Sequence, residues 1–281
     1  MKYIKYLIIV VVVLLLRAYH ILDQQEYTQV VFLDVGQGSA AYVRADTGFT
    51  MLIDAGETNK TLRSLAKFHP WWNKNINVLV ASHPDKDHIG MFPKIIRRYD
   101  VDVFIETGKK SLFGPYVTLK DELRTRGILE KNFKPMDRLE VSPGVHMLFL
   151  HPSLNEVDEL SDNDTSLIFI LDVYGTTFLF MGDASKKIEQ ELIRKYKNLL
   201  NVDVLVVGHH GSNTSTDGEF LSKVAPSYGV ISSGAENKYG HPHNGVLERL
   251  EDVGTQVLRT DELGNIQFKI ATDGTFDIMV R

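Results

Sequence analysis

The chain has 281 residues, of which 43% are apolar, no cysteine, and a formal net charge of −5 at pH 7. This length and composition suit one large globular domain or two ordinary ones. The lack of cysteine excludes thiolate metal sites, cysteine nucleophiles and disulfides, and the acidic balance argues against a protein that grips long nucleic acids by their phosphates.

The N-terminus carries a short basic segment followed by an apolar run. Lys2 and Lys5 precede residues 7–16, which read LIIVVVVLLL. Ten residues match the apolar core of a signal peptide, whereas a free-standing span needs about 20, although neighbouring apolar residues can extend the run. Because no A-x-A cleavage motif follows, we predict that residues 1–25 are an uncleaved membrane anchor, with a cleaved signal peptide as the alternative. The lysines favour an extracytoplasmic body, residues 26–281.

Periodic apolar residues predict an α/β domain in the body. Hairpin strands come first and alternating strands and helices follow, so helices must cover both faces of at least one sheet. The predicted strands lie at 28–34, 40–44, 50–54, 78–81, 101–107, 145–150, 166–173, 176–181, 202–207, 228–231, 257–259, 266–270 and 276–280. The predicted helices lie at 58–68, 91–99, 116–126, 185–196, 220–224 and 245–253. Trp71 and Trp72, after Pro70, are predicted to form an exposed pair that could contact substrate or a membrane surface.

Side chains that can bind metal ions follow several of these strands. Four of them lie within six residues of one loop, directly after the apolar run 78–81, and burying them together is costly unless a cation is bound. Because functional residues gather at the carboxyl ends of strands in α/β folds, we expect the later candidates to join this loop. The candidates are His83, Asp85, Asp87, His88, Asp183, His209, His210, His241 and His243.

These candidates outnumber the three protein ligands of a catalytic zinc site. A carboxylate after a central strand could bridge two ions, so we predict two divalent metal ions. A ligand set of histidine and aspartate without sulfur suits zinc or manganese. Taken alone, Asp183 could instead cap the helix that follows it; the joint occurrence of so many candidates favours the metal centre.

The same residues resemble the metallo-β-lactamase superfamily, whose hallmark is H-x-H-x-D-H followed by later Asp and His ligands. Here Asp85 replaces the second histidine. Six further motifs are similar to the C-terminal hydrolase domain of the ComEC competence (DNA-uptake) proteins and their free-standing relatives. They are Asp34-Val35-Gly36-Gln37-Gly38, Leu52-Ile53-Asp54-Ala55-Gly56, Asn163-Asp164-x-Ser166-Leu167, Gly182-Asp183, His209-His210-Gly211-Ser212 and Tyr239-Gly240-His241-Pro242.

The resemblance covers about residues 28–270 and implies a four-layer αββα sandwich with the site at one edge of its two sheets. Carried over position by position, the first metal site would take His83, Asp85 and one of His209 and His210, and the second Asp87, His88 and His241, with Asp183 bridging. We favour His209 as the ligand because it directly follows its strand, and His210 as a phosphate contact or proton donor; the reverse order stays open. Substrate contacts or support of the ligands are expected from Asp54, Asn163, Asp164 and Ser212.

Such a site implies a metal-dependent hydrolase, and we predict a phosphodiesterase with Asp87 and His210 as catalytic residues. DNA is one candidate substrate; a cell-envelope phosphodiester such as a teichoic-acid phosphorylcholine is the runner-up. A β-lactamase or other amide or ester hydrolase is a further alternative, against which Asp85 argues by making the first site less suited to zinc. The complete ligand set argues against a non-enzymatic binding module. No protein partner is inferred.

Overall fold

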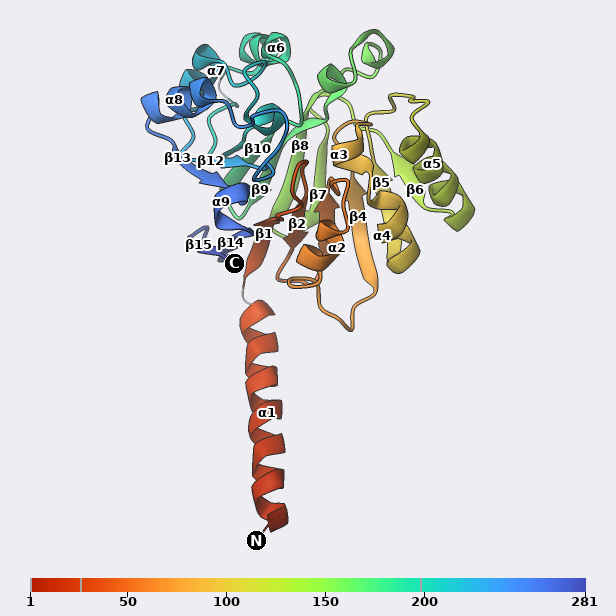
Figure 1. The fold of residues 1–281 in the computed structure, drawn as a ribbon, viewed down its shortest axis with the longest axis vertical. Coiled ribbons are helices and arrows are strands. Elements are labelled where there is room, and N and C mark those ends of the chain that lie inside the picture. The colour runs from red at the N-terminus through yellow and green to blue at the C-terminus, as the bar shows by residue number, and fades with distance from the viewer. Residues whose placement is uncertain (1, 26, 198) are drawn as a thin grey trace.

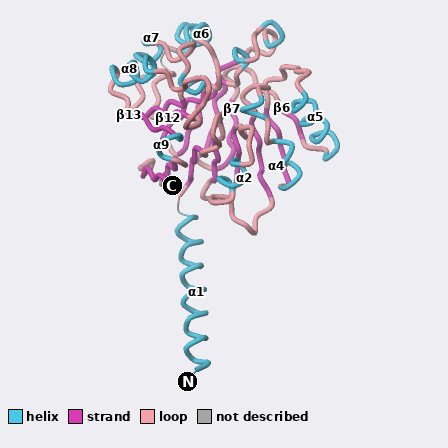
Figure 2. The backbone as a smooth tube through the Cα atoms, in the orientation of Figure 1, coloured by secondary structure: helices cyan, strands magenta, loops and turns pink. Residues whose placement is uncertain are grey.

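The computed structural model describes residues 2–25, 27–197 and 199–281, without the side chains of residues 2 and 16–25. Within these residues the body is built from two sheets (Figure 1, Figure 2). One sheet has the order β15 (Phe276–Val280), β14 (Ile266–Ile270), β1 (Thr28–Phe32), β2 (Ala41–Arg44), β3 (Thr50–Ile53), β4 (Asn75–Val80), β5 (Asp100–Ile105) and β6 (Leu129–Lys131). The other has the order β13 (Gln256–Arg259), β12 (Tyr228–Ile231), β11 (Val204–Val206), β10 (Thr176–Phe180), β9 (Ile168–Val173), β8 (Val145–His151) and β7 (Arg138–Ser142).

Helices lie on the outer face of each sheet (Figure 1). The first sheet is covered by α2 (Lys60–Leu65), α4 (Phe92–Arg98) and α5 (Gly114–Arg126), and the second by α6 (Lys186–Tyr196), α7 (Gly218–Val224) and α8 (Asn244–Asp252). Short helices complete the body: α3 (Lys86–Ile89), α9 (Thr260–Leu263) and the 3₁₀ turns Val157–Glu159, Asn163–Thr165 and Gly208–Gly211.

Alternation along the strands produces the layers. In β1, Val30 and Phe32 join the apolar cluster between the two sheets, whereas Val31 joins the cluster beneath the first set of helices. Successive side chains of a strand point to opposite faces, so a strand that is apolar throughout must be covered on both sides. A third cluster lies between the second sheet and α6, α7 and α8. These three clusters confirm the α/β class and the four-layer sandwich.

The strand directions determine which ends meet. In the first sheet, β2 is antiparallel to both β1 and β3, while β3 is parallel to β4, so β1, β3 and β4 run in the same direction. In the second sheet, β10 and β11 are parallel. The loops after β3 and β4 therefore leave the first sheet at one edge, and the loops after β10 and β11 leave the second sheet together.

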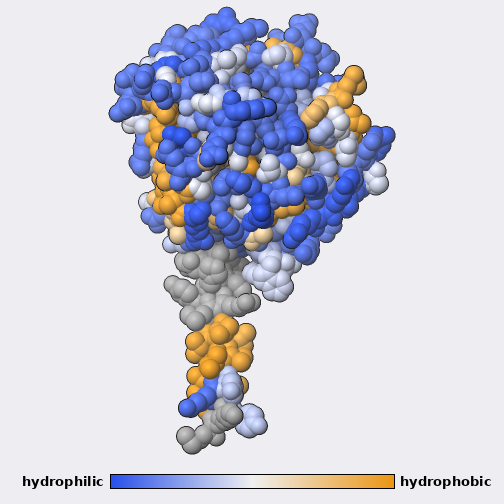
Figure 3. Space-filling model, in the orientation of Figure 1, coloured by the Kyte–Doolittle hydropathy of each residue, from blue (hydrophilic) through white to orange (hydrophobic). Residues whose placement is uncertain are grey.

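Helix α1 (Lys2–Gln25) precedes the body and leaves it at the end where β1 begins (Figure 1). Its described side chains, those of residues 3–15, are all exposed, and the apolar ones form the orange part of this helix in Figure 3. The side chains of residues 16–25, which belong to the predicted anchor, lie outside the described part. Among the described residues, no helix has both the length and the apolarity that a membrane crossing needs.

The sequence pattern does not predict β6 and β7. All of β6 is exposed, and its backbone pairs with one edge of β5. Residues of β7 alternate between exposed and partly buried up to Ser142 and carry charges at Arg138 and Glu140. Edge strands of this kind lack the apolar pattern of a buried strand, so only their pairing partners reveal them.

Candidate metal centre

The structure gathers the metal-binding candidates where strands of both sheets end. Asp54 follows β3, His83 follows β4, Asp183 follows β10 and His210 follows β11. The sheets meet at these loops, because His83 Nε2 lies 3.9 Å from Asp183 Oδ2. Asp183 turns into the cluster rather than capping α6, whose N-cap is Ser185.

Two groups of three side chains are compact enough to hold a metal ion. One contains His83, His88 and Asp183, and the other contains Asp87, His88 and His210, with all ligand atoms of a group within 4.8 Å of one another. The groups share His88, whose Nε2 lies 3.2 Å from Asp183 Oδ1 and 3.3 Å from His210 Nε2. Asp183 also lies beside the second group, 3.6 Å from His210 Nε2. One carboxylate therefore touches both groups.

His209 and His210 project in different directions. Both have a left-handed backbone, with φ of 51° and 54°. His210 is buried, with Nε2 3.2 Å from Asp87 Oδ2, and its Nδ1 donates to a backbone carbonyl after β12, which leaves the lone pair of a neutral ring on Nε2. His209 is partly exposed; its Nε2 lies 3.7 Å from Asp183 Oδ2 and its Nδ1 2.9 Å from Thr214 Oγ1. The position beside Asp87 that we expected His241 to take thus holds His210.

Asp85 and His241 lie at the rim. Both line a cavity of about 210 Å³ together with His209 and both carboxylates of the two groups. The Asp85 side chain is 40% exposed, with Oδ2 3.7 Å from His83 Nε2. The His241 ring stacks on Tyr239, with centroids 5.6 Å apart, and its centroid lies 6.3 Å from that of His210. His241 is therefore in neither compact group.

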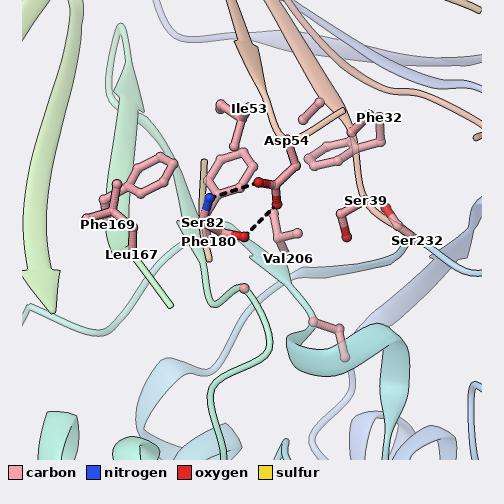
Figure 4. Close-up of a pocket in the computed structure, with 14 residues that line it drawn as sticks. Phe32, Ser39, Ile53, Asp54, Ser82, Leu167, Phe169, Phe180, Val206 and Ser232 are labelled. Atoms are coloured by element: carbon pink, nitrogen blue, oxygen red, sulfur yellow. Dashed lines mark hydrogen bonds between the residues drawn. The ribbon is translucent and has the colours of Figure 1, made fainter. Parts of the chain in front are cut away.

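Asp54 lies behind His88 and determines how its ring is presented. Figure 4 shows the Asp54 carboxylate accepting hydrogen bonds from the backbone N–H and the hydroxyl of Ser82, both at 2.8 Å. The other neighbour of this carboxylate is His88 Nδ1, at 2.7 Å. Because an ionised carboxylate only accepts, His88 carries a proton on Nδ1 and turns Nε2 toward the cluster.

Ser82 is a site residue that sequence reasoning missed. Its hydroxyl lies 3.0 Å from His83 Nδ1 and 3.1 Å from His88 Nδ1, so one side chain links Asp54 to both rings. The only sequence signal is its position directly before His83. Phe169 and Phe180, which lie near it in Figure 4, belong to the apolar cluster between the sheets.

Burial and mutual attraction shift the pKa values in this cluster. Burial alone would lower the pKa of His88, but the carboxylates of Asp183 and Asp54 raise it well above its usual value. Burial would raise the pKa of Asp183, yet the charges of His88 and His210 hold it well below its usual range. The pKa of Asp87 is likewise lowered, against burial, by its hydrogen bond with His210 and the charge of His88. A divalent cation would supply the positive charge that these carboxylates require.

Three buried polar atoms at the site have no hydrogen-bond partner among the described residues. They are His83 Nε2, His241 Nδ1 and Asp183 Oδ1, the last of which has only its ionic contact with His88 Nε2 at 3.2 Å. Leaving a buried donor or acceptor unpaired costs about 1–3 kcal/mol. Imidazole nitrogens and carboxylate oxygens are ligands of divalent metals, so a bound ion would satisfy such atoms. The residues present therefore fit a metal ion.

Asn163 and Asp164 lie outside both compact groups. Asp164 Oδ1 accepts a hydrogen bond from the backbone N–H that precedes α6. The carbonyl of Asn163 accepts one from Ser166 Oγ, which in turn accepts one from the backbone N–H of Asp183. These residues therefore support the Asp183 loop through the backbone.

Ser212 and Glu189 hold the loop that follows the paired histidines. Ser212 Oγ accepts a 3.0 Å hydrogen bond from Thr214 Oγ1, the same oxygen that contacts His209. Ser212 therefore supports His209 indirectly, through Thr214. Glu189 is 1% exposed and accepts the backbone N–H groups of residues 216 and 217. Burial nevertheless raises the pKa of Glu189 to about 7.

The turn between β1 and β2 closes another side of the site. Gly38 has a φ of +113°, and a Cβ on it would lie 2.2 Å from the backbone oxygen of Asp87. Gln37 lines the cavity together with Tyr239. Neither Gln37 nor Tyr239 is among the predicted site residues, although each lies in one of the motifs that carry the resemblance.

Comparisons with known proteins identify the family. The family model described as "Metallo-beta-lactamase superfamily" matches residues 33–235. The chain is 32% identical over 276 residues to ComE operon protein 3 of Bacillus subtilis, covering 89% of the chain and 34% of that protein. It is 33% identical over 243 residues to Competence protein ComA of Neisseria gonorrhoeae, covering 86% of the chain and 32% of that protein.

Solved structures show the same fold. The metallo-beta-lactamase fold protein YhfI from Bacillus subtilis superposes with a TM-score of 0.57 at 12% identity, covering 86% of the chain and 99% of YhfI. The chain spans about a third of the length of the curated relatives it matches. It belongs to the metallo-beta-lactamase superfamily and is a relative of the ComEC-like competence proteins.

Proposed function

We propose that the chain is a metal-dependent hydrolase that cleaves phosphodiesters at a centre of two divalent ions, zinc or manganese. The observation that carries the proposal is the pair of compact groups that share His88 and adjoin Asp183, with unpaired buried atoms pointing into them. Because the single inward nitrogen of His88 can serve only one ion, the first ion would be held by His83 and Asp183, with Asp85 and His209 at the rim completing its ligands. The second would be held by Asp87, His88 and His210, with Asp183 between the two.

Two such ions would supply Lewis acidity, which activates a water and neutralises charge on the phosphate oxygens. The chain's residues position the reaction around them. Asp54 and Ser82 hold His88 with Nε2 inward, and Thr214 orients His209. His241 lines the cavity with an unpaired Nδ1, so it can contact the phosphate, one of the roles first expected of His210. Burial and the neighbouring histidines lower the pKa of His241 to about 4, which favours a neutral ring that binds rather than protonates.

The surroundings favour a phosphodiester. The 210 Å³ cavity shares Gln37, Asp87 and Tyr239 with a neighbouring cavity of about 530 Å³, which Lys86 and Lys238 also line. Glu236 and Glu57, which pairs with Lys86 at 2.7 Å, line this cavity as well, so it is not a basic patch. The preference for a phosphodiester rests on the carboxylate-rich ligand set, which suits hard cations that bind phosphate oxygens.

DNA is the first candidate substrate because one relative is named Competence protein ComA and because the motifs of the chain resemble those of DNA-uptake proteins. Residues 26–281 contain 28 basic and 35 acidic side chains, a net charge of −7, once the three basic residues and one acidic residue of 1–25 are set aside. This charge favours recognition of one scissile phosphate over an extended grip, and it leaves a cell-envelope phosphodiester as the alternative.

We also propose that α1 attaches the chain to a membrane, with the body outside the cytoplasm. Its large apolar side chains from Tyr3 to Leu15 are 44–87% exposed, and a continuous apolar surface of this kind is stabilised by lipid. Lys2 and Lys5 before the run favour an N-terminus on the cytoplasmic side.

The test is hydrolysis of bis-p-nitrophenyl phosphate by chelator-treated protein after addition of manganese or zinc. We expect turnover with at least one metal and its loss in Asp87→Ala. Asp121→Ala is the matched control, because this carboxylate is 63% exposed and pairs with Arg124 on α5. No turnover with either metal, or full activity in Asp87→Ala, would overturn the proposal. Comparing a DNA oligonucleotide with p-nitrophenyl phosphorylcholine would then separate the substrate candidates, and nitrocefin would test β-lactamase activity.

A further inference from the structure

We propose that Trp71 and Trp72 form a second contact with the lipid bilayer, seated in its headgroup region, so that the metal centre faces away from the membrane. The inference rests on the proposed attachment through α1. It adds a defined orientation of the domain, which an attached helix alone does not provide.

The two indoles are exposed and lie side by side. Trp71 is 73% exposed and Trp72 53%, and their rings pack edge to face with centroids 5.7 Å apart. By contrast, the largest fully buried side chains of the body are mainly phenylalanines of the sheets and helices. Exposed apolar rings are unfavourable in water, and an indole, with its apolar ring and single N–H donor, suits the boundary between lipid and water.

The loop that carries the pair is firmly held. His69 is 4% exposed; its Nδ1 lies 2.9 Å from the hydroxyl of Tyr42 and its Nε2 3.0 Å from the carbonyl of Asn73. A further hydrogen bond joins the N–H of Asn73 to the carbonyl of Pro70. The pair is therefore presented by an ordered turn, which lowers the entropy lost when the indoles enter a bilayer.

Strand directions place this turn at the end of the body where α1 joins it. The pair precedes β4, and α1 precedes β1. Because β1 and β4 run in the same direction within one sheet, their starts lie at the same end. Figure 1 shows the loop between α2 and β4 at the end from which α1 leaves. A membrane that holds α1 would meet this loop.

The metal centre lies at the opposite end of the same strand. His83 follows the end of β4, and six strand residues separate the two loops, a rise of roughly 20 Å. Exposed Lys67 and Lys74 flank the pair, whereas exposed Asp100 and Asp102 begin the neighbouring parallel strand β5, so the indoles rather than net charge carry the proposed contact. The end of the body that carries Trp71 and Trp72 would thus contact the membrane, and the metal centre at the opposite end would face the aqueous compartment.

The chain permits a direct test, because Trp71 and Trp72 are its only tryptophans. The full chain is reconstituted into vesicles of phosphatidylcholine and phosphatidylglycerol, and vesicle flotation establishes attachment. Tryptophan fluorescence is then measured against aqueous iodide and against lipids brominated near the headgroup, with Trp71→Phe and Trp72→Phe to separate the two indoles. The matched control is W71F/W72F/Y239W, which moves the reporter to a 52% exposed position beside the metal centre.

We expect the native pair to become several-fold less sensitive to iodide on reconstitution and to be quenched by the brominated lipids, while the reporter at position 239 stays open to iodide. A chain that floats with the vesicles while its tryptophan pair remains fully open to iodide would overturn the lipid contact and leave the attachment by α1 intact. A chain that does not float would overturn both. Neither result bears on phosphodiester hydrolysis, which is measured separately.

Discussion

Replacing Asp54 by Asn tests whether Asp54 determines the tautomer and orientation of His88. Asn is the substitution of choice because Asp54 has a φ of 55°, which Asn tolerates, and because the two side chains have the same shape. The amide oxygen can still accept the backbone N–H of Ser82. The amide nitrogen would face His88 Nδ1 and can only donate there, so the ring proton is driven to Nε2, the nitrogen that faces Asp183 and His210.

The expected loss is large. Removing the partner that orients a metal-binding histidine usually lowers metal affinity or activity about 10–100-fold, or about 1.4–2.7 kcal/mol. The buried carboxylate also loses a charge-assisted contact with His88 at 2.7 Å, so the metal-free protein should unfold about 1–3 kcal/mol more easily.

Titration of the chelator-treated protein with manganese and zinc measures the first effect, and urea unfolding without metal measures the second. Ser82→Ala is the graded comparison: it removes one hydrogen bond to Asp54 but keeps the contact of Asp54 with His88, so its metal affinity should fall less. Wild-type metal affinity and turnover in Asp54→Asn would refute the argument that Asp54 sets the tautomer of His88.

Three further predictions concern the surroundings of the site. His210→Ala should reduce metal-dependent turnover more than His209→Ala, because His210 is buried within a compact group and His209 is at the rim; equal losses in parallel assays would contradict this. Burial raises the pKa of Glu189 from 4.5 to about 7, so the folded chain binds the extra proton and stability should fall as pH rises through that window, by at most about 3 kcal/mol; urea unfolding from pH 4.5 to 7.5 should show this slope weakened in Glu189→Gln. Gly38→Ala should destabilise the protein by about 1–3 kcal/mol and depress activity, because its Cβ would strike the backbone of the metal-binding loop. Gly48→Ala, at a φ of +89° with open space around it, controls for backbone strain, and similar thermal melts for the two variants would argue against the clash.

Much of the fold follows from local patterns. The predicted strand at residues 228–231 coincides with β12, and those at 266–270 and 276–280 coincide with β14 and β15. Strands that are apolar on both faces predict a sheet that is covered on both sides, so the layered architecture can be predicted from the sequence. The exposed edge strand β6 cannot be predicted in this way, because a strand that pairs through its backbone without burying side chains leaves no periodic apolar pattern.

The chemical character of the site is likewise a property of the sequence: carboxylates and imidazoles placed after buried strands have few uses other than a metal centre. The division of these side chains into two compact groups cannot be predicted from the sequence. Consecutive left-handed residues send His210 inward and leave His209 at the rim, and the loop after β12 keeps His241 against Tyr239. Ser82 could be identified only from the structure, in which β3 and β4 pair side by side and place Asp54 against Ser82, whose hydroxyl contacts both histidine rings. Residue types and the ends of strands are local features, so they can be predicted from the sequence. The direction of each histidine ring depends on backbone dihedrals and on partners far away in the sequence, and only the folded structure brings these partners together.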